Sequence, residues 1–395
     1  MRSLRTQVGI VGAGPAGLML GHLLHGAGID SVILENRSQD HVIERVRAGV
    51  LEQGTVDLMT AVGLGDRLKR EGMIHRGIYL AFDGRRHQVD MASLTGGRSI
   101  AIYGQNEVVK DLIEARVATG RPLLFQVDGV RLTELTSANP RVRFHHANAA
   151  QELTCEYVAG CDGFHGVCRP SIPSSHLHVF ERVYPYAWLG ILASARPSSD
   201  ELVYSRHERG FALFSMRSPD VTRLYLQCAP DEALSAWPDE RIWTELNERL
   251  GTLDGWRPTE GPILQKNVTG MRSFVAEPMR YGRLFLAGDA AHIVPPTGAK
   301  GLNLAMADVN LLADALVRAL KHGDTSRLDR YSETALKRAW RAQRFSWWMT
   351  SMLHRSDSQN PFDHRRQLAE LEYLVSSQAA MTSLAENYVG FPFDQ

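Results

Sequence analysis

Cysteine is scarce in this sequence, which has four such residues among 395: Cys155, Cys161, Cys168 and Cys228. Their spacing matches no metal-finger pattern, and so few cysteines do not make a disulfide scaffold. We therefore expect buried free thiols and no metal site. An excess of one charge is also absent, because 44 Lys and Arg balance 44 Asp and Glu. Nucleic-acid binding and a polybasic membrane patch both need a basic excess, so both are disfavoured.

Long apolar runs are missing as well. No stretch approaches the roughly 20 apolar residues of a membrane helix. The N-terminal MRSLRTQ leads straight into a strand-like VGIVGAG, which leaves no room for the core of a signal peptide. We therefore expect a cytoplasmic protein that does not contact membranes. The remaining composition, 44% hydrophobic and 22% charged, is ordinary for a folded chain of two or three domains.

A glycine-rich turn follows the first predicted strand. Residues 12–17 read GAGPAG, in which Gly12, Gly14 and Gly17 match the dinucleotide fingerprint and Ala16 lies within it. Such a turn lets a pyrophosphate approach the N-terminus of the next helix, where free N–H groups favour negative charge. The following strand ends at Glu35, whose carboxylate would accept hydrogen bonds from a ribose. The fingerprint alone leaves NAD and FAD both open.

Two further segments favour FAD. The buried stretch RLFLAGDAAH at 283–292 resembles the second FAD motif of flavoproteins, in which Asp289 would meet the ribityl chain. A helix beginning near Gly298 would then stabilise negative charge on a reduced flavin. The stretch CDGFHG at 161–166 resembles the Asp-Gly motif of flavin-dependent aromatic hydroxylases. That resemblance implies that Asp162 contacts both FAD and the nicotinamide cofactor.

Longer strings extend this resemblance over essentially the whole chain. They are RAGVLEQG at 47–54, FERVYP at 180–185, PPTGAKGLNL at 295–304, RFSWWMT at 344–350 and AENYVG at 385–390. Together they resemble the 4-hydroxybenzoate 3-monooxygenase family of flavin-dependent aromatic hydroxylases. The resemblance implies hydroxylation of 4-hydroxybenzoate at its 3-position to 3,4-dihydroxybenzoate, in aromatic catabolism. The reaction would use tightly but non-covalently bound FAD, NAD(P)H and O2, through a flavin C4a-hydroperoxide.

The expected fold class is α/β with α+β elements. A Rossmann-like FAD-binding domain would be interleaved with a mixed or antiparallel substrate sheet, because clean linkers are absent. The expected divisions are 1–180 for the FAD domain, with part of the substrate sheet inserted around 76–105, then 181–270 for the substrate sheet, 271–330 for a return to the FAD domain, and 331–395 for C-terminal helices. Exposed aromatic helix faces usually mark interfaces. With the aromatic cluster Phe345, Trp347 and Trp348, the last region predicts a homodimer, as the resemblance also implies.

Substrate binding falls to Arg217, which matches the family's carboxylate-binding arginine. A guanidinium can donate two parallel hydrogen bonds to a carboxylate and so fixes its orientation. Ser215 and Tyr225 match the hydroxyl donors beside it. By the same resemblance, Tyr204 would hydrogen-bond the substrate phenol. Tyr388 would continue a proton path toward solvent.

His75 would lie at the outer end of that path, because histidine titrates near neutral pH. The resemblance assigns further roles around the flavin. Pro296 would offer a backbone carbonyl near the hydroxylated carbon, and Lys300 would add positive potential. The remaining expected cofactor-binding residues are Arg45 and Arg47 at the FAD phosphates, Gln105 and Asn303 near the flavin or substrate, and Thr297 and Leu302 in the PPTGAKGLNL string.

One departure concerns the reductant. NADPH-dependent members of the family are expected to carry a basic residue after Glu35 and an aromatic residue five positions later, whereas this chain has Asn36 and His41. Arg37 could still meet a 2′-phosphate. NADPH is the first expectation, and NADH or dual use stays open. Two other functions also stay open: hydroxylation of another hydroxybenzoate such as the 3-isomer, and a non-catalytic flavin-binding redox sensor.

Overall fold

The glycine turn lies between a buried strand and a helix, as the sequence predicts. In the computed structural model, which describes residues 2–44, 49–356 and 360–393, β2 (Val8–Val11) leads into α1 (Pro15–Gly26), and β3 (Ser31–Leu34) follows. All four residues of each strand are buried, which is expected of a parallel sheet covered on both faces. Proline stands at the first position of α1, where its missing N–H costs nothing.

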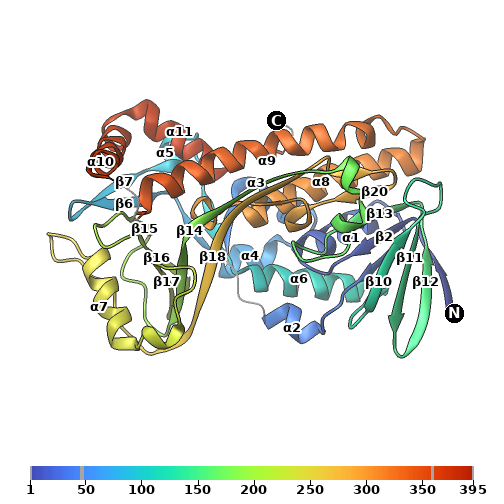
Figure 1. The fold of residues 1–395 in the computed structure, drawn as a ribbon, viewed down its shortest axis with the longest axis horizontal. Helices are drawn as coiled ribbons and strands as arrows, with labels where there is room; N and C mark the ends of the chain where they lie inside the picture. Colours follow the sequence, from blue (N-terminus) through green and yellow to red (C-terminus); the bar gives the residue numbers. More distant parts are fainter. Residues whose placement is uncertain (1, 45–48, 357–359, 394–395) are drawn as a thin grey trace.

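Around this unit lies a six-stranded sheet in the order β19-β20-β13-β2-β3-β9. Its other strands are β9 (Leu123–Leu124), β13 (Tyr157–Gly160), β19 (Arg280–Tyr281) and β20 (Leu284–Leu286). Every pairing is parallel except β19 with β20. Helix α1 contacts both α6 (Gln105–Ala118) and α8 (Gly301–His322), and the three helices lie in the half of the molecule that holds this sheet (Figure 1). This is the predicted Rossmann-like half.

Two small sheets and several short helices flank that half. The four-stranded sheet contains β1 (Arg2–Arg5), β10 (Asp128–Thr133), β11 (Arg141–His146) and β12 (Ala149–Thr154). The three-stranded sheet contains β4 (Val50–Glu52), β5 (Met73–His75) and β8 (Ile100–Ile102). The helices between these strands are α2 (Gln39–Glu44), α3 (Gln53–Ala61), α4 (Gly65–Glu71) and α5 (Met91–Leu94).

An eight-stranded sheet forms the other half, in the order β21-β18-β14-β17-β16-β15-β6-β7. Its strands are β6 (Ile78–Phe82), β7 (Arg85–Val89), β14 (His178–Ala193), β15 (Leu202–Ser205), β16 (Ala212–Ser218), β17 (Val221–Cys228), β18 (Ile263–Glu277) and β21 (His292–Ile293). The pairing is antiparallel throughout except for β15 with β6, which is parallel. The sheet is therefore mixed, and the predicted fold class is confirmed, whereas the domain boundaries stay a prediction.

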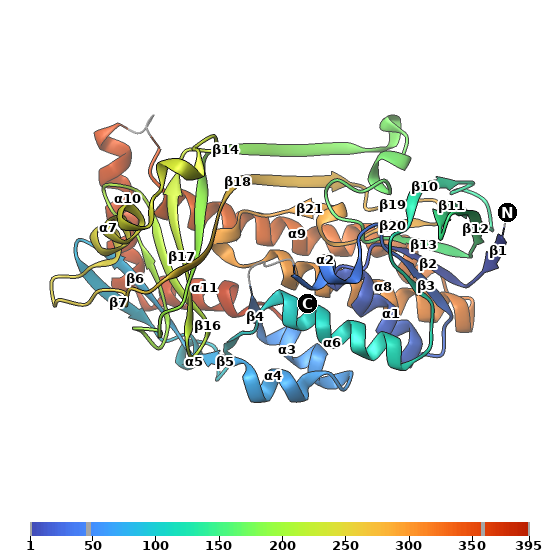
Figure 2. The same ribbon diagram turned by 90° about the horizontal axis from the view of Figure 1, so that it is seen from below.

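Two long elements connect the halves. Strands β14 and β18 pair along most of their length as a ribbon that runs from one half to the other (Figure 2). Helix α9 (Ser326–Leu353) spans about 42 Å at 1.5 Å per residue. Its first turns pack in the core of the six-stranded sheet and its last turns in that of the eight-stranded sheet. Helices α7 (Asp239–Leu250), α10 (Pro361–Ser376) and α11 (Gln378–Val389) cover the second half. None of the described helices is long and apolar enough to cross a membrane.

A histidine just after α9 is buried among aromatic rings. The ring of His354 is 2% exposed and stacks on Tyr186 and Phe211, with centroids 4.8 Å and 4.4 Å away. Trp188 donates its indole N–H to Nε2 at 2.6 Å, and Nδ1 lies 3.0 Å from the carbonyl of Thr350. The ring is therefore neutral, with its proton on Nδ1. Burial lowers the pKa of His354 to about 3.

This histidine makes folding sensitive to acid. Its pKa is about 3 in the folded chain and about 6.5 when unfolded, so the unfolded chain binds the extra proton first as the pH falls. We expect the free energy of unfolding to drop by about 2 kcal/mol between about pH 7 and about pH 5 from this group. Urea unfolding of His354→Gln, which retains an acceptor and a donor, should show a shallower pH slope. An unchanged slope would contradict the assignment.

Candidate active site

Backbone crowding explains two of the fingerprint glycines. Gly12 has φ of +105°, and a Cβ there would lie 2.3 Å from the carbonyl oxygen of Cys161. A Cβ on Gly17 would lie 2.0 Å from the carbonyl oxygen of Gly12. Both positions therefore need glycine for the fold itself. Gly14 differs, because a Cβ there would meet nothing within 4 Å. The space beside Gly14, at the N-terminus of α1, is where a pyrophosphate would approach.

The carboxylate of Glu35 lies at that turn. One oxygen accepts a hydrogen bond from the backbone N–H of Ala13 at 2.8 Å, and the other accepts one from the backbone N–H of Arg37 at 2.9 Å. The carboxylate therefore holds the glycine turn and the segment after β3 in one geometry. Each carboxylate oxygen has a further lone pair, so Glu35 keeps the capacity to accept from a ribose hydroxyl.

Two aspartates predicted to face the cofactor lie at strand ends of the same sheet. Asp162 follows β13, and its Oδ2 accepts from the backbone N–H groups of Val167 and Cys168 at 2.6 and 2.8 Å. Its Oδ1 is buried without a hydrogen-bond partner among the described residues, and burial raises the pKa of Asp162. Asp289 lies in the short 3-10 helix Gly288–Ala290 after β20 and is half-buried.

Arg223 is a candidate that the sequence analysis missed. It lies on β17 and is 5% exposed, yet its Nε and Nη1 have no hydrogen-bond partner in the part of the chain that the structure describes. Its Nη2 is 3.2 Å from Asn267 Oδ1, and its guanidinium stacks on Tyr225. A buried cation with unused donors points to an anionic ligand. The signal available in the sequence was its position two residues before Tyr225, on the same strand face.

The open space at Gly14 fits the pyrophosphate of a dinucleotide such as FAD, and the unpaired Oδ1 of Asp162 fits a hydroxyl or N–H donor of such a ligand. When bound, FAD would be held by the glycine turn, Glu35 and Asp162. Arg45 and Arg47, predicted at the FAD phosphates, lie outside the described residues.

Strand register brings the predicted substrate residues to one sheet face. Tyr204 pairs with Leu213, which in turn pairs with Tyr225, so the two tyrosines lie in one cross-strand row roughly 10 Å apart along the sheet. Ser215, two residues after Leu213, is on the same face, and its hydroxyl donates to the carbonyl of Arg223 at 2.9 Å. The ring of Trp188, which the sequence analysis also missed, borders Tyr225 at 4.8 Å.

Arg217 reaches this face from a bulge in β16. The register shifts between Met216 and Ser218, and bulges commonly redirect a side chain beside an active site. A Cβ on Gly49 would lie 2.5 Å from Nη1 of Arg217, so the guanidinium lies against that backbone. Burial lowers the pKa of Arg217. The N-terminus of α6 also lies close to this backbone, and the helix begins at the predicted site residue Gln105.

The hydroxyls of Tyr204 and Tyr388 are 2.5 Å apart. Both side chains are 1% exposed, and Tyr388 comes from α11, 184 residues further along the chain. Burial raises the pKa of both phenols.

The third member of the predicted path, His75, is the last residue of β5. Its side chain is only 2% exposed. Its Nδ1 is 2.7 Å from Oε2 of Glu201, a third residue that the sequence analysis missed.

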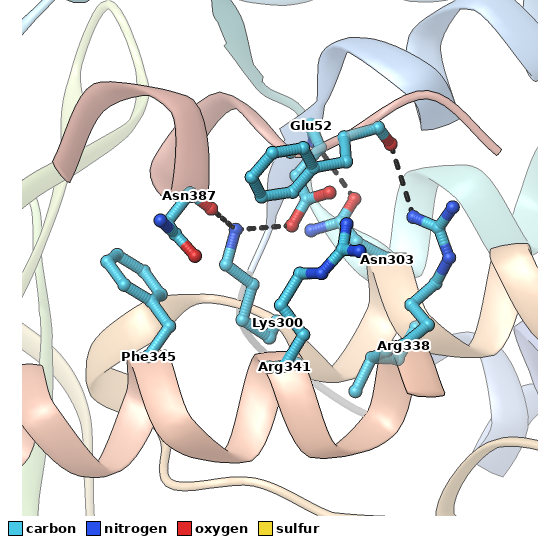
Figure 3. Close-up of a pocket in the computed structure, with 11 residues that line it drawn as sticks. Glu52, Lys300, Asn303, Arg338, Arg341, Phe345 and Asn387 are labelled. Atoms are coloured by element: carbon cyan, nitrogen blue, oxygen red, sulfur yellow. Dashed lines mark hydrogen bonds and ion pairs between the residues drawn. The ribbon is translucent and has the colours of Figure 1, made fainter. Parts of the chain in front are cut away.

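Lys300 is buried opposite Glu52, a fourth residue that the sequence analysis missed. Its ammonium is 2.5 Å from Oε1 of Glu52 and also donates to the carbonyls of Asn387 and Tyr388 (Figure 3). Burial lowers the pKa of Lys300, whereas Glu52 opposes that shift. These residues line a pocket together with Asn303 and with side chains from α9, among which Arg338, Arg341 and Phe345 face it (Figure 3). The positive charge that Lys300 was expected to place near the flavin is thus paired with the carboxylate of Glu52.

The side chain of Asn303 forms four hydrogen bonds within the chain. Its oxygen accepts from Glu52 N and Thr55 Oγ1, and its nitrogen donates to the carbonyls of Val50 and Ala299. It therefore holds β4 against the start of α8. The neighbouring predicted residues lie in the same connection: Pro296 and Thr297 in the 3-10 helix Pro296–Gly298, and Leu302 in the first turn of α8. The hydroxyl of Thr297 is buried and accepts from Thr350 at 2.9 Å.

Comparison with known proteins agrees with this geometry. A family model described as an FAD binding domain matches residues 5–346. A p-hydroxybenzoate hydroxylase of Acinetobacter baylyi (strain ATCC 33305 / BD413 / ADP1) is 47% identical over 394 residues, covering 100% of this chain and 97% of that protein. A 3-(3-hydroxy-phenyl)propionate/3-hydroxycinnamic acid hydroxylase of Mycolicibacterium gilvum (strain PYR-GCK) is 27% identical, covering 76% of this chain and 51% of that protein.

Among solved structures, p-nitrophenol 4-monooxygenase from Pseudomonas putida DLL-E4 superposes with a TM-score of 0.83 at 20% identity, covering 99% of each chain. That likeness concerns the fold. The fold and the glycine turn define a dinucleotide-binding flavoprotein that uses FAD. The chain belongs to the FAD-binding family of flavin-dependent aromatic hydroxylases.

The open space at Gly14 gives a direct test of the cofactor site. Gly14→Ala should leave folding unchanged, because the added methyl meets no protein atom within 4 Å, yet it should narrow the approach of the pyrophosphate. We expect the FAD dissociation constant to rise at least about tenfold, roughly 1.4 kcal/mol, in fluorescence titrations of the apoprotein. Gly26→Ala, at the far end of α1 and also in open space, is the matched control. Equal FAD affinity in both variants would refute the placement.

Proposed function

We propose that this chain is a monooxygenase that hydroxylates 4-hydroxybenzoate at its 3-position, using FAD, NAD(P)H and O2. The observation that carries the proposal is the buried contact between the Tyr204 and Tyr388 hydroxyls on the same sheet face as Ser215 and Tyr225. The relative that matches along the whole chain is a p-hydroxybenzoate hydroxylase, which supports the same substrate.

The face suits a flat ring with unlike ends. Arg217 would bind the carboxylate with two parallel hydrogen bonds, and the hydroxyls of Ser215 and Tyr225 would complete its surroundings. At the other end of the row, Tyr204 would receive the phenol. The roughly 10 Å that separates Tyr204 from Tyr225 along their cross-strand row leaves room for one benzene ring with its two hydrogen-bonded ends.

Activation of the ring would depend on the tyrosine pair. A phenol ionises near pH 10, so at neutral pH the bound ring is a poor nucleophile until its proton is removed. Tyr204 would accept a hydrogen bond from the substrate phenol, and Tyr388 would pass the phenol's proton on toward His75. Bound FAD supplies the chemistry by which NAD(P)H reduces O2. Burial of the pair excludes water from the reacting ring.

The choice of reductant depends on the residues that follow Glu35. NADPH is our first choice, with Arg37 facing a 2′-phosphate, and NADH is the alternative because Asn36 and His41 depart from the expected pattern. The cytoplasmic location expected from the sequence stays a prediction.

Oxygen uptake tests the function directly. The FAD-loaded protein should consume O2 with NADPH or NADH when 4-hydroxybenzoate is present and should release 3,4-dihydroxybenzoate and water. Preference for 3-hydroxybenzoate would identify a hydroxylase for another isomer. Oxygen uptake that no hydroxybenzoate stimulates would instead support a redox sensor, which has no need of a proton path.

Replacing Tyr204 by phenylalanine should uncouple the reaction. The variant keeps the ring's volume but lacks the hydroxyl that receives the substrate's proton, so the bound phenol stays neutral. Loss of a hydrogen bond to a developing charge costs a few kcal/mol, enough to change the product ratio by about two orders of magnitude. The variant should consume NAD(P)H and O2 but release mostly hydrogen peroxide.

Product formed per nicotinamide oxidised is the measurement, and Tyr388→Phe should show a milder loss. Tyr184→Phe is the control, because this buried tyrosine in the same sheet bonds Ser273 instead. Full coupling in Tyr204→Phe would show that another group ionises the phenol.

We also propose that the chain forms a homodimer. The predicted aromatic cluster on α9 is only partly exposed, since Phe345 is 1% exposed whereas Trp347 is 43% exposed. Further exposed apolar side chains lie where α9 meets β14, because Phe180 stacks edge-on against Trp340 at 5.5 Å and Val183 is 66% exposed. Such patches usually mark interfaces.

Sedimentation should give twice the monomer mass for the native protein. Val183→Glu should shift the equilibrium to monomers without loss of FAD, because a charge would then be buried at the interface. A native monomer, or a variant dimer of equal stability, would reject this surface.

A further inference from the structure

The carboxylate of Glu201 is held by three consecutive residues. Oε2 lies 2.7 Å from Nδ1 of His75, and Oε1 accepts from the backbone N–H groups of Arg76 and Gly77, both at 3.0 Å. The side chain of Glu201 is 14% exposed and that of His75 is 2% exposed. The contact is therefore largely shielded from water, where a charged hydrogen bond orients its partners strongly.

Strand pairing fixes this arrangement. Glu201 directly precedes β15, and Leu202 pairs in parallel with Ile78 of β6. The segment Arg76–Gly77, which leads into β6, therefore lies beside Glu201. The same strand carries Tyr204 three residues later. The residue that would meet the substrate phenol thus lies on β15, and the carboxylate that orients His75 lies directly before that strand.

From this geometry we infer that Glu201 is a positioning residue that holds His75 as the Nδ1–H tautomer, leaving Nε2 as the nitrogen that exchanges protons at the end of the Tyr204–Tyr388 path. The inference rests on the proposed function for the path, whereas the tautomer itself does not.

The chemistry follows from the hydrogen-bonding capacity of each group. An ionised carboxylate only accepts, so Nδ1 must carry the proton that it donates to Glu201. In a neutral imidazole the other nitrogen, Nε2, is then an acceptor. A proton that reaches Nε2 makes the ring cationic beside the carboxylate, which stabilises that cation. Release of the proton from Nε2 to solvent restores the starting tautomer without any rotation of the ring.

Glu201 also acts electrostatically on the next member of the path. The pKa of Tyr388 is raised mainly by burial, with smaller contributions from Tyr204, Glu201 and Glu52. When His75 takes up a proton, it neutralises the charge of Glu201 that Tyr388 experiences. Tyr388 and His75, which are neighbours on the proposed path, are thereby coupled through one carboxylate.

Nitrogen-15 NMR of the histidine-labelled, FAD-loaded protein tests the tautomer. At an alkaline pH at which the ring is neutral, His75 should show a protonated Nδ1 and an unprotonated Nε2. In Glu201→Gln the amide oxygen can keep the two backbone N–H bonds, so its NH2 would face Nδ1 and force the proton to Nε2. A native Nε2–H tautomer, or an unchanged tautomer in the variant, would overturn the inference.

Proton release tests the consequence. Mixing with 4-hydroxybenzoate in weakly buffered solution containing an indicator dye should show release at least about tenfold slower in Glu201→Gln, with FAD content unchanged. His75→Gln should slow release similarly, and the double variant should be no slower than His75→Gln, because Glu201 acts through His75. Additive losses, or normal release in Glu201→Gln, would refute the positioning role.

The matched control is Asp90→Asn. Asp90 lies in the same region, where it caps α5 through Ser93, and α5 in turn bonds the carbonyl of Arg76 through Ala92. This variant should keep both the native tautomer and the native release rate. If the wild type forms no 3,4-dihydroxybenzoate, the proposed function fails, and the NMR result still decides the tautomer.

Discussion

The hydrogen bond between the hydroxyls of Tyr204 and Tyr388 is the contact on which the site depends. It joins a strand of the eight-stranded sheet to the last helix of the chain, and neither hydroxyl is open to water. Two buried phenols that satisfy each other avoid the penalty of an unpaired polar group, which is about 1–3 kcal/mol. In the proposed function the same pair would receive the substrate phenol, so the stability of the packing and the chemistry of the site would rest on the same two atoms.

A second buried cluster supports the first. Lys300 and Glu52 lie behind Tyr388, and Lys300 donates to the carbonyls that end α11. Removing either member of such a pair leaves an unpaired buried charge, which is strongly destabilising. Because Asn303 bonds the backbone of Glu52, the glycine-rich connection before α8, the strand β4 and the C-terminal helix are held in one arrangement. The residues that would face the flavin, on β4 and at the start of α8, therefore cannot move independently of the C-terminal helix α11.

Local motifs were predictable from the sequence and long-range partners were not. The glycine turn could be predicted because its geometry depends on adjacent residues, and Gly12 and Gly17 indeed lie where a side chain would collide with backbone. Substrate-facing residues followed from a resemblance that covers the chain. Glu201 and His75, by contrast, are 126 residues apart, and no periodicity or spacing signals their contact. The exposed aromatic face expected on α9 is found only in part, because Phe345 lies in the core that α9 shares with the sheet whereas Trp347 is exposed.

The interleaved topology explains why such partners are far apart in sequence. Strands β6 and β7 come from residues 78–89, yet they complete a sheet whose other strands begin at residue 178. The parallel pairing of β15 with β6 closes that gap, and it places Glu201 beside Arg76 and Gly77. A parallel pair needs a long crossover, and here the crossover contains β9 and β13 of the six-stranded sheet together with β10, β11 and β12 of the four-stranded sheet. The proposed path from Tyr204 to His75 would therefore depend on segments that become neighbours only when β15 has paired with β6.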